Sequence, residues 1–234
     1  KNLDIPSSEG AQLAVDQANK RGGVLDRPVN LLLADGETKP ARIMAETERL
    51  IGENPAMSGL IGFSDTDMVL AAAKVAAKDR RVFLTSGATS PLLPRDVPDY
   101  LFLACFGDNV QAAAGAEWAY DKLKARTVAV LFNKATSYTR LLHGYFETRF
   151  KQLGGRVLSV QPYDPADLRF GMRALLRADL VYLSAYPDEV TTIIPMLRKA
   201  GVKAPILGGD GLDIGAAWKE IPETRDVYFT THAY

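Results

Sequence analysis

Hydrophobic and polar positions along this chain alternate between two kinds of segment. Longer segments carry apolar residues at helical spacing, as in 138–153. Strands that alternate with helices of roughly 10 to 16 residues predict right-handed βαβ units and parallel sheets. The short continuous apolar runs that predict buried strands are 29–34, 59–62, 100–106, 127–132, 156–160, 180–183, 205–207, 227–230 and a run that begins at Val82.

Capping residues predict where the helices begin and end. Ser7-Ser-Glu9 can cap the first helix and Gly22-Gly23 can end it, while Pro40 starts the second. In the first helix the apolar stripe at helical spacing is Ala11, Ala14, Val15 and Ala18. A further helix is expected at 109–123, and its apolar face consists of Ala113, Ala116, Tyr120 and Leu123. Others are expected after Thr66 and at 138–153, 166–177, 188–200 and 214–220.

This order predicts an α/β protein with two doubly wound parallel-sheet lobes, residues 1–123 and residues 124–234. The division is placed where the loop chemistry resets, near residues 123–126. The first predicted element is a helix, whereas in a doubly wound sheet an interior strand normally precedes it. The last predicted strand, 227–230, has no helix after it. We therefore expect both lobes to be incomplete.

Small polar residues follow two strands of the first lobe, in the loops where open α/β sheets bind ligands. Ser64, Asp65 and Thr66 precede a helix, where N–H groups and hydroxyls can seat a carboxylate. Simple N-capping of that helix is the alternative. Ala88 and Thr89 add a backbone carbonyl and a second hydroxyl, which suits an α-amino acid; an ordinary βα turn is the alternative here.

The second lobe offers three residues at the ends of its strands. Tyr138 and Tyr186 follow the strands at 127–132 and 180–183, and Asp210 follows the strand at 205–207 within Gly208-Gly-Asp-Gly211. Tyrosines in such places often pack on their own loop, and an Asp flanked by glycines can simply make a turn. A lone carboxylate there can also complete a clamp for an amino acid.

Composition and charge narrow the class of function. Lys+Arg and Asp+Glu both number 28, and a net charge of zero argues against a nucleic-acid footprint or a polybasic membrane surface. One cysteine and two histidines make a zinc site improbable. Walker, Gly-x-Ser-x-Gly and Gly-x-Gly-x-x-Gly patterns are absent, and no nucleophile has an evident base. We therefore expect no catalytic residue, metal or cofactor.

The motifs resemble the type I periplasmic binding proteins, and most closely their leucine/isoleucine/valine-binding branch of ABC-transporter receptors. The resemblance runs over nearly the whole chain. The matching stretches are residues 10–23, Leu33-Ala-Asp35, Leu60-Ile-Gly62, Ser86-Gly-Ala-Thr-Ser-Pro91 and Tyr186-Pro-Asp-Glu189. The resemblance implies two lobes joined by a hinge, with a ligand cleft between the lobes.

The resemblance also implies roles for the candidate residues. Hydroxyls at Thr66 and Thr89 hold a ligand carboxylate in the family. Backbone around Gly87 and Ala88, with an acid matching Asp210, holds the ammonium. Tyr138 and Tyr186 match tyrosines of the second lobe. An aspartate stands where the leucine-binding branch commonly has a glutamate, and Asn133-Lys-Ala-Thr-Ser-Tyr138 replaces the usual Asp-x-x-Tyr-Gly, so the sequence leaves the ligand open.

The function that the resemblance implies is an extracytoplasmic solute-binding receptor of an ABC importer. Its ligand would be a small amino acid of branched-chain type or a related carboxylate or amide, and its protein partners would be permease subunits. The location would be the periplasm or the extracellular face, with or without a lipid anchor. One alternative is an effector-sensing module of a regulator with the same fold. A more distant alternative is an α/β hydrolase using Asp210 or Ser90.

Overall fold

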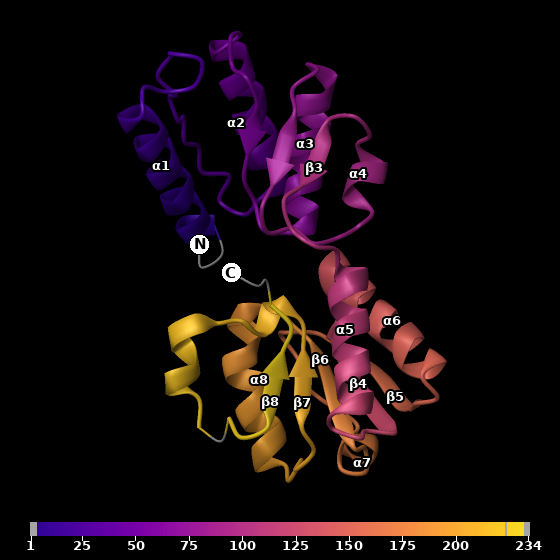
Figure 1. Cartoon of the computed structure of the whole chain (residues 1–234). Coiled ribbons are helices and arrows are strands. Elements are labelled where there is room, and N and C mark those ends of the chain that lie inside the picture. Colours follow the sequence, from indigo (N-terminus) through magenta and orange to yellow (C-terminus); the bar gives the residue numbers. More distant parts are fainter. Residues whose placement is uncertain (1–3, 223, 232–234) are drawn as a thin grey trace. The chain divides into compact units, whose positions relative to one another are not determined.

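The chain, in a computed structural model that describes residues 4–222 and 224–231, divides into two compact units, Lys1–Cys105 and Phe106–Tyr234 (Figure 1). Each unit is an α/β structure built on a parallel sheet, as predicted. The division lies earlier than the predicted one after residue 123. The reason is helix α5 (Asp108–Asp121), whose Ala112 and Ala116 lie in the core of the second unit.

The first unit has a three-stranded parallel sheet in the order β1-β2-β3. One face of this sheet, with Leu60, Phe83 and Leu101 in register, packs with the buried residues of helices α2 and α3. The elements of the first unit are α1 (Asp4–Lys20), α2 (Pro40–Glu53), β1 (Leu60–Ile61), α3 (Thr66–Lys78), β2 (Phe83–Thr85), α4 (Leu93–Asp96) and β3 (Leu101–Leu103).

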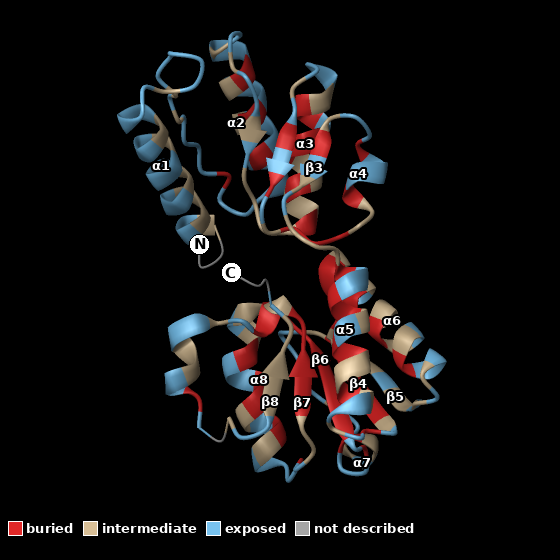
Figure 2. Ribbon diagram, viewed as in Figure 1, coloured by how far each residue is buried: buried red, intermediate tan, exposed pale blue. Residues whose placement is uncertain are grey.

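The opposite face of the same sheet is exposed in the first unit. Ile61, Leu84 and Phe102 stand in register across the three strands and are 56%, 38% and 49% exposed. Helix α1 forms, but none of its described residues is buried, so its predicted apolar stripe packs only partly (Figure 2). Among the described residues, only one face of this sheet is therefore covered.

The predicted strand at 29–34 is not formed, which corrects the sequence analysis. Val29 pairs its backbone N–H and C=O with the side-chain amide of Asn19, at 2.8 and 2.9 Å, and Leu33 is 66% exposed. An apolar run becomes a strand only when a neighbouring strand satisfies its backbone groups. The first-unit sheet begins at β1, so this segment has no strand beside it among the described residues.

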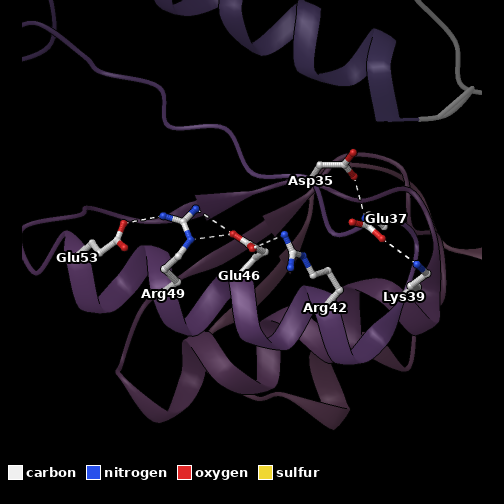
Figure 3. A network of polar contacts seen from close by, with 7 residues as sticks. All are labelled: Asp35, Glu37, Lys39, Arg42, Glu46, Arg49 and Glu53. Atoms are coloured by element: carbon white, nitrogen blue, oxygen red, sulfur yellow. Dashed lines mark hydrogen bonds and ion pairs between the residues drawn. The ribbon is translucent and has the colours of Figure 1, made fainter.

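The solvent-facing side of α2 carries alternating charges (Figure 3). Glu46 accepts from Arg42 and from Arg49, and Arg49 also pairs with Glu53, at N···O distances between 2.6 and 3.0 Å. Pairs of this spacing on an exposed helix face add modestly to helix stability, because solvent screens them. The network therefore supports the outer face of a helix whose other face, with Ile43 and Ile51, is buried.

The second unit has a five-stranded parallel sheet in the order β5-β4-β6-β7-β8, with helices on both faces (Figure 1). Val128 and Val130 of β4 face α5 and α6, whereas Ala129 and Leu131 face the side that carries α8. Its remaining elements are β4 (Thr127–Asn133), α6 (Ser137–Gln152), β5 (Arg156–Tyr163), α7 (Met172–Leu175), β6 (Leu180–Ser184), α8 (Pro187–Lys199), β7 (Ile206–Gly208), the 3₁₀ turns Asp210–Leu212 and Gly215–Glu220, and β8 (Val227–Phe229).

The helix predicted at 166–177 is reduced to the four residues of α7. Local polar contacts compete with the longer helix. The Asp164 side chain accepts from Ala166 N at 3.1 Å, and the Asp164 backbone carbonyl accepts from Asp167 N at 2.8 Å. Among the helices in the part of the chain that the structure describes, none has the length and apolar character that crossing a bilayer requires.

Candidate functional site

In the first unit, the loops that follow β1 and β2 lie against each other. Thr85 ties them together, since its hydroxyl donates to Phe63 O at 2.7 Å and accepts from Ala88 N at 3.1 Å. A side chain at Gly87 would place its Cβ 2.6 Å from Ser64 Oγ. The fold thus brings Ser64, Gly87 and Ala88 together, and a glycine is required at 87 because Ser64 approaches so closely.

Asp65 and Thr66 have different surroundings although they are adjacent. The Asp65 carboxylate caps α3 and accepts from Asp67 N at 2.8 Å and Met68 N at 3.0 Å. These two helix N–H groups are therefore occupied, as the capping alternative expected. The Thr66 hydroxyl is buried and has no hydrogen-bond partner among the described residues.

The middle of the loop after β2, residues 88–90, is buried. Ala88 and Thr89 are each 1% exposed, and the Ala88 carbonyl accepts from Cys105 Sγ at 3.5 Å. A thiol is a weak donor, so this carbonyl keeps most of its capacity to accept from a stronger donor such as an ammonium. The predicted carbonyl and hydroxyl thus come from adjacent buried residues of one loop.

In the second unit, Tyr138 and Tyr186 lie at the point where the strand order reverses. The chain leaves β4 to form β5 on one side and then returns to form β6 on the other side, and ligands in open α/β sheets bind at such a switch point. Tyr138 follows β4 and Tyr186 follows β6. Their rings pack edge to face, with centroids 5.7 Å apart.

Asp210 joins this pair from the loop after β7. Its Oδ1 accepts from Tyr138 Oη at 2.7 Å, and the same hydroxyl accepts from Gly211 N at 3.0 Å. A Cβ at Gly211 would lie 2.2 Å from Ala185 O and 3.1 Å from Tyr138 Oη, so the glycine beside Asp210 allows the loop to pack against Tyr138. The fold thus brings together all three residues that we predicted in the second unit.

Two polar residues that the sequence analysis did not select complete this cluster. Asp108 and Gln111 of α5 are 0% and 2% exposed, and Gln111 Nε2 donates to Asp108 Oδ1 at 2.9 Å and to Asp210 Oδ1 at 2.7 Å. Burial, with the Asp210 and Asp108 carboxylates, raises the pKa of Tyr138 well above its ordinary value, so its hydroxyl stays protonated near neutral pH.

A third carboxylate, on Glu189, holds the start of α8. It accepts from Tyr163 Oη at 2.5 Å, from Tyr186 N at 3.1 Å and from the side chain of Asn133. Burial raises the pKa of Glu189 even though these donors favour its ionised form. Glu189 therefore orders the backbone that carries Tyr186.

The cluster suits binding of a polar ligand by shape and hydrogen bonding. Within the described part of the chain, no three His, Cys, Asp or Glu side chains are grouped so that they could hold a metal ion. In each unit, the polar residues selected from the sequence lie beyond the ends of parallel strands, which is where α/β proteins that bind small ligands hold them.

A model of the periplasmic binding protein family matches residues 2–234, and the chain belongs to that family. The leucine-binding protein LivK of Thermotoga maritima is 27% identical to this chain, with a TM-score of 0.83 over 97% of this chain and 64% of its own. LivJ of Streptococcus pneumoniae, solved with isoleucine, is 26% identical, with a TM-score of 0.78 over 88% and 59% of the two chains.

Among curated relatives, the Leu/Ile/Val-binding protein BraC3 of Rhizobium johnstonii is 26% identical over 213 residues, which are 89% of this chain and 57% of the relative. The chain thus spans somewhat more than half the length of the curated relatives that it matches. The family is one of substrate-binding proteins, so the hydrolase alternative is set aside.

Proposed function

We propose that this chain belongs to a solute-binding receptor of an ABC importer, and that its ligand is a small amino acid of branched-chain type. Related carboxylates and amides belong to the same proposal. The observation that carries it is the family match over residues 2–234, together with relatives named for binding leucine, isoleucine and valine.

The surroundings of the candidate residues support an α-amino acid as the ligand class. The buried Thr66 hydroxyl has no partner among the described residues, and burying a hydroxyl without a hydrogen bond costs free energy. A ligand carboxylate bound at Thr66 and Thr89 removes that cost. In the first unit the Ala88 carbonyl is an oxygen acceptor suited to an ammonium, and in the second unit the Asp210 carboxylate is the acid that the family resemblance assigns to the ammonium.

Partners and location follow from the same assignment. A receptor of this class delivers its ligand to permease subunits, and it works at the periplasmic or extracellular face. The balanced charge of 28 basic and 28 acidic residues gives no electrostatic footprint for a nucleic-acid partner.

A thermal-shift and calorimetric screen of the chain tests the ligand class. The probes are L-leucine, L-isoleucine, L-valine, acetamide and 4-hydroxybenzoate. A ligand present at 100 times its Kd stabilises the protein by about 2.7 kcal/mol. We expect the aliphatic amino acids to produce this shift, and no shift with any probe would refute the proposal.

Two matched variants sharpen the test. Thr89→Val removes a buried hydroxyl assigned to the ligand carboxylate, whereas Thr47→Val removes a buried hydroxyl that donates to Ile43 O within α2 at 2.7 Å. We expect Thr89→Val to weaken leucine binding roughly tenfold or more and Thr47→Val to leave it unchanged. Equal affinities in the two variants would contradict the assignment of Thr89.

A further inference from the structure

Gln111 is a buried polar residue whose amide uses all of its hydrogen-bonding capacity. Its Nε2 donates to Asp108 and Asp210, while its Oε1 accepts from Asp210 N at 3.1 Å and Thr230 Oγ1 at 2.9 Å. An amide offers two donors and two acceptor sites, and here all four are taken. One side chain on α5 thereby links the loop after β7 with the end of β8.

Asp210 is bound by Gln111 in two ways. The backbone N–H of Asp210 donates to the amide oxygen, and its Oδ1 accepts from the amide nitrogen at 2.7 Å, the same distance as from Tyr138 Oη. Contacts to both the backbone and the carboxylate fix the direction of the side chain as well as its position. Bonds to a charged group are also stronger than those between neutral groups.

We infer that Gln111 is the positioning residue for Asp210 in ligand binding, and this inference rests on the proposed function. Its amide holds the Asp210 carboxylate in one orientation before an ammonium arrives, so that binding does not have to order it. Asp108 shares the amide and fixes its rotation in turn. A glutamate at this position would supply no donors and would face two carboxylates.

Leucine and 4-methylpentanoate, which is leucine without its α-amino group, provide the test by calorimetry. If Gln111 acts through Asp210, Gln111→Met lowers leucine affinity roughly ten- to hundredfold and leaves 4-methylpentanoate affinity unchanged. Adding Gln111→Met to Asp210→Asn then causes little further loss. Equal loss for both probes would show a general structural role and overturn the inference.

Gln161→Met is the matched control, because it removes an amide that exchanges two hydrogen bonds with Gly171, at 2.7 and 3.1 Å, at the far side of the same sheet. We expect it to leave the ratio of the two affinities unchanged. Gln111→Asn keeps the amide but withdraws it by one methylene, so it is the milder variant if Gln111→Met does not fold. An intermediate loss for leucine alone supports the inference, and no loss refutes it.

Amide hydrogen exchange separates this inference from the proposed function. In the ligand-free protein, Gln111→Met should speed exchange of the Asp210 amide, whereas the Gly211 amide, bonded to Tyr138, should change little. Unchanged exchange at Asp210 would overturn the positioning role. If the wild-type chain binds no probe, the proposed function fails, and the exchange data alone decide whether Gln111 positions Asp210.

Discussion

Removal of the Tyr138 hydroxyl is the most informative single change in the second unit. The Tyr138 hydroxyl donates to Asp210 Oδ1 at 2.7 Å and accepts from Gly211 N at 3.0 Å, and the residue is 8% exposed. Tyr138→Phe keeps the ring packed on Tyr186 and deletes only these two bonds. The variant therefore measures the polar cluster without opening a cavity in the core.

The expected loss of stability follows from the two partners of the hydroxyl. A hydrogen bond to a charged group contributes about 1.5–3 kcal/mol, and a buried N–H left without a partner costs about 1–3 kcal/mol. Gln111 still donates to the same carboxylate oxygen, so the lower part of the first range applies. With about 1.5 kcal/mol for the bond to Asp210 and about 1–3 kcal/mol for the unpartnered N–H of Gly211, we expect a total loss of about 2.5–4.5 kcal/mol in the free energy of unfolding of the second unit.

Tryptophan fluorescence in urea is the suitable assay, because both tryptophans, Trp118 and Trp218, lie in the second unit. The signal therefore reports that unit alone. For an m-value of about 2 kcal/mol/M, the midpoint should fall by roughly 1–2 M with an unchanged slope.

Tyr228→Phe is the matched control for this measurement. Its hydroxyl makes one exposed contact, to Asp226 at 3.4 Å, so its loss should change stability by no more than about 0.5 kcal/mol. If Tyr138→Phe were as mild as Tyr228→Phe, the argument that buried hydrogen bonds hold the Asp210 loop would be wrong.

Two further predictions concern the core of the first unit and the pH dependence of the second. Leu101→Ala should lower the free energy of unfolding by about 2–5 kcal/mol, because Leu101 is 1% exposed, whereas Phe102→Thr, at a 49% exposed position, should lower it by less than about 1 kcal/mol. Amide hydrogen exchange of β2 measures both variants. Equal loss of protection in the two would contradict the burial argument. Burial lowers the pKa of His143 below 6.5, because it disfavours the charged imidazolium. The contribution of the neutral His143 side chain to stability is therefore complete above the unfolded-state pKa and is lost as the pH falls through the folded-state pKa. Between pH 7 and pH 5, the urea midpoint of His143→Gln should fall less steeply than that of the wild-type protein. An equal fall in the two proteins would refute this.

The elements of the second unit were largely predictable because they satisfy each other within the chain. The strands at 127–132 and 180–183 were each found to within one residue, since strands buried on both faces read as continuous apolar runs. The segment at 29–34 is also largely apolar but has no strand beside it among the described residues. Composition predicts the tendency of a segment to form a strand, whereas pairing decides whether the strand forms.

The face of α5 was misjudged for a related reason. A hydrophobic pattern assigns Ala113, Ala116 and Tyr120 to the buried side, but the fold also buries Asp108 and Gln111 on the side that carries Ala112, Ala116 and Ala119. A sequence pattern counts such polar residues as solvent-facing. Gln111 bonds to partners about 100 positions away, at Asp210 and Thr230, and Asp108 bonds to Gln111 in turn, so spacing within one helix does not reveal their burial.

The same dependence on distant partners separates the acidic residues of two strand-end loops, Asp65 and Asp210. Asp65 and Asp210 both follow a strand and precede a helical turn, so local sequence treats them alike. The Asp65 carboxylate accepts two backbone N–H groups of its own helix, whereas the Asp210 carboxylate accepts from Tyr138 and Gln111, two side chains far away in the chain. A carboxylate engaged by its own helix serves the fold, and one oriented by distant side chains can be aimed at a ligand.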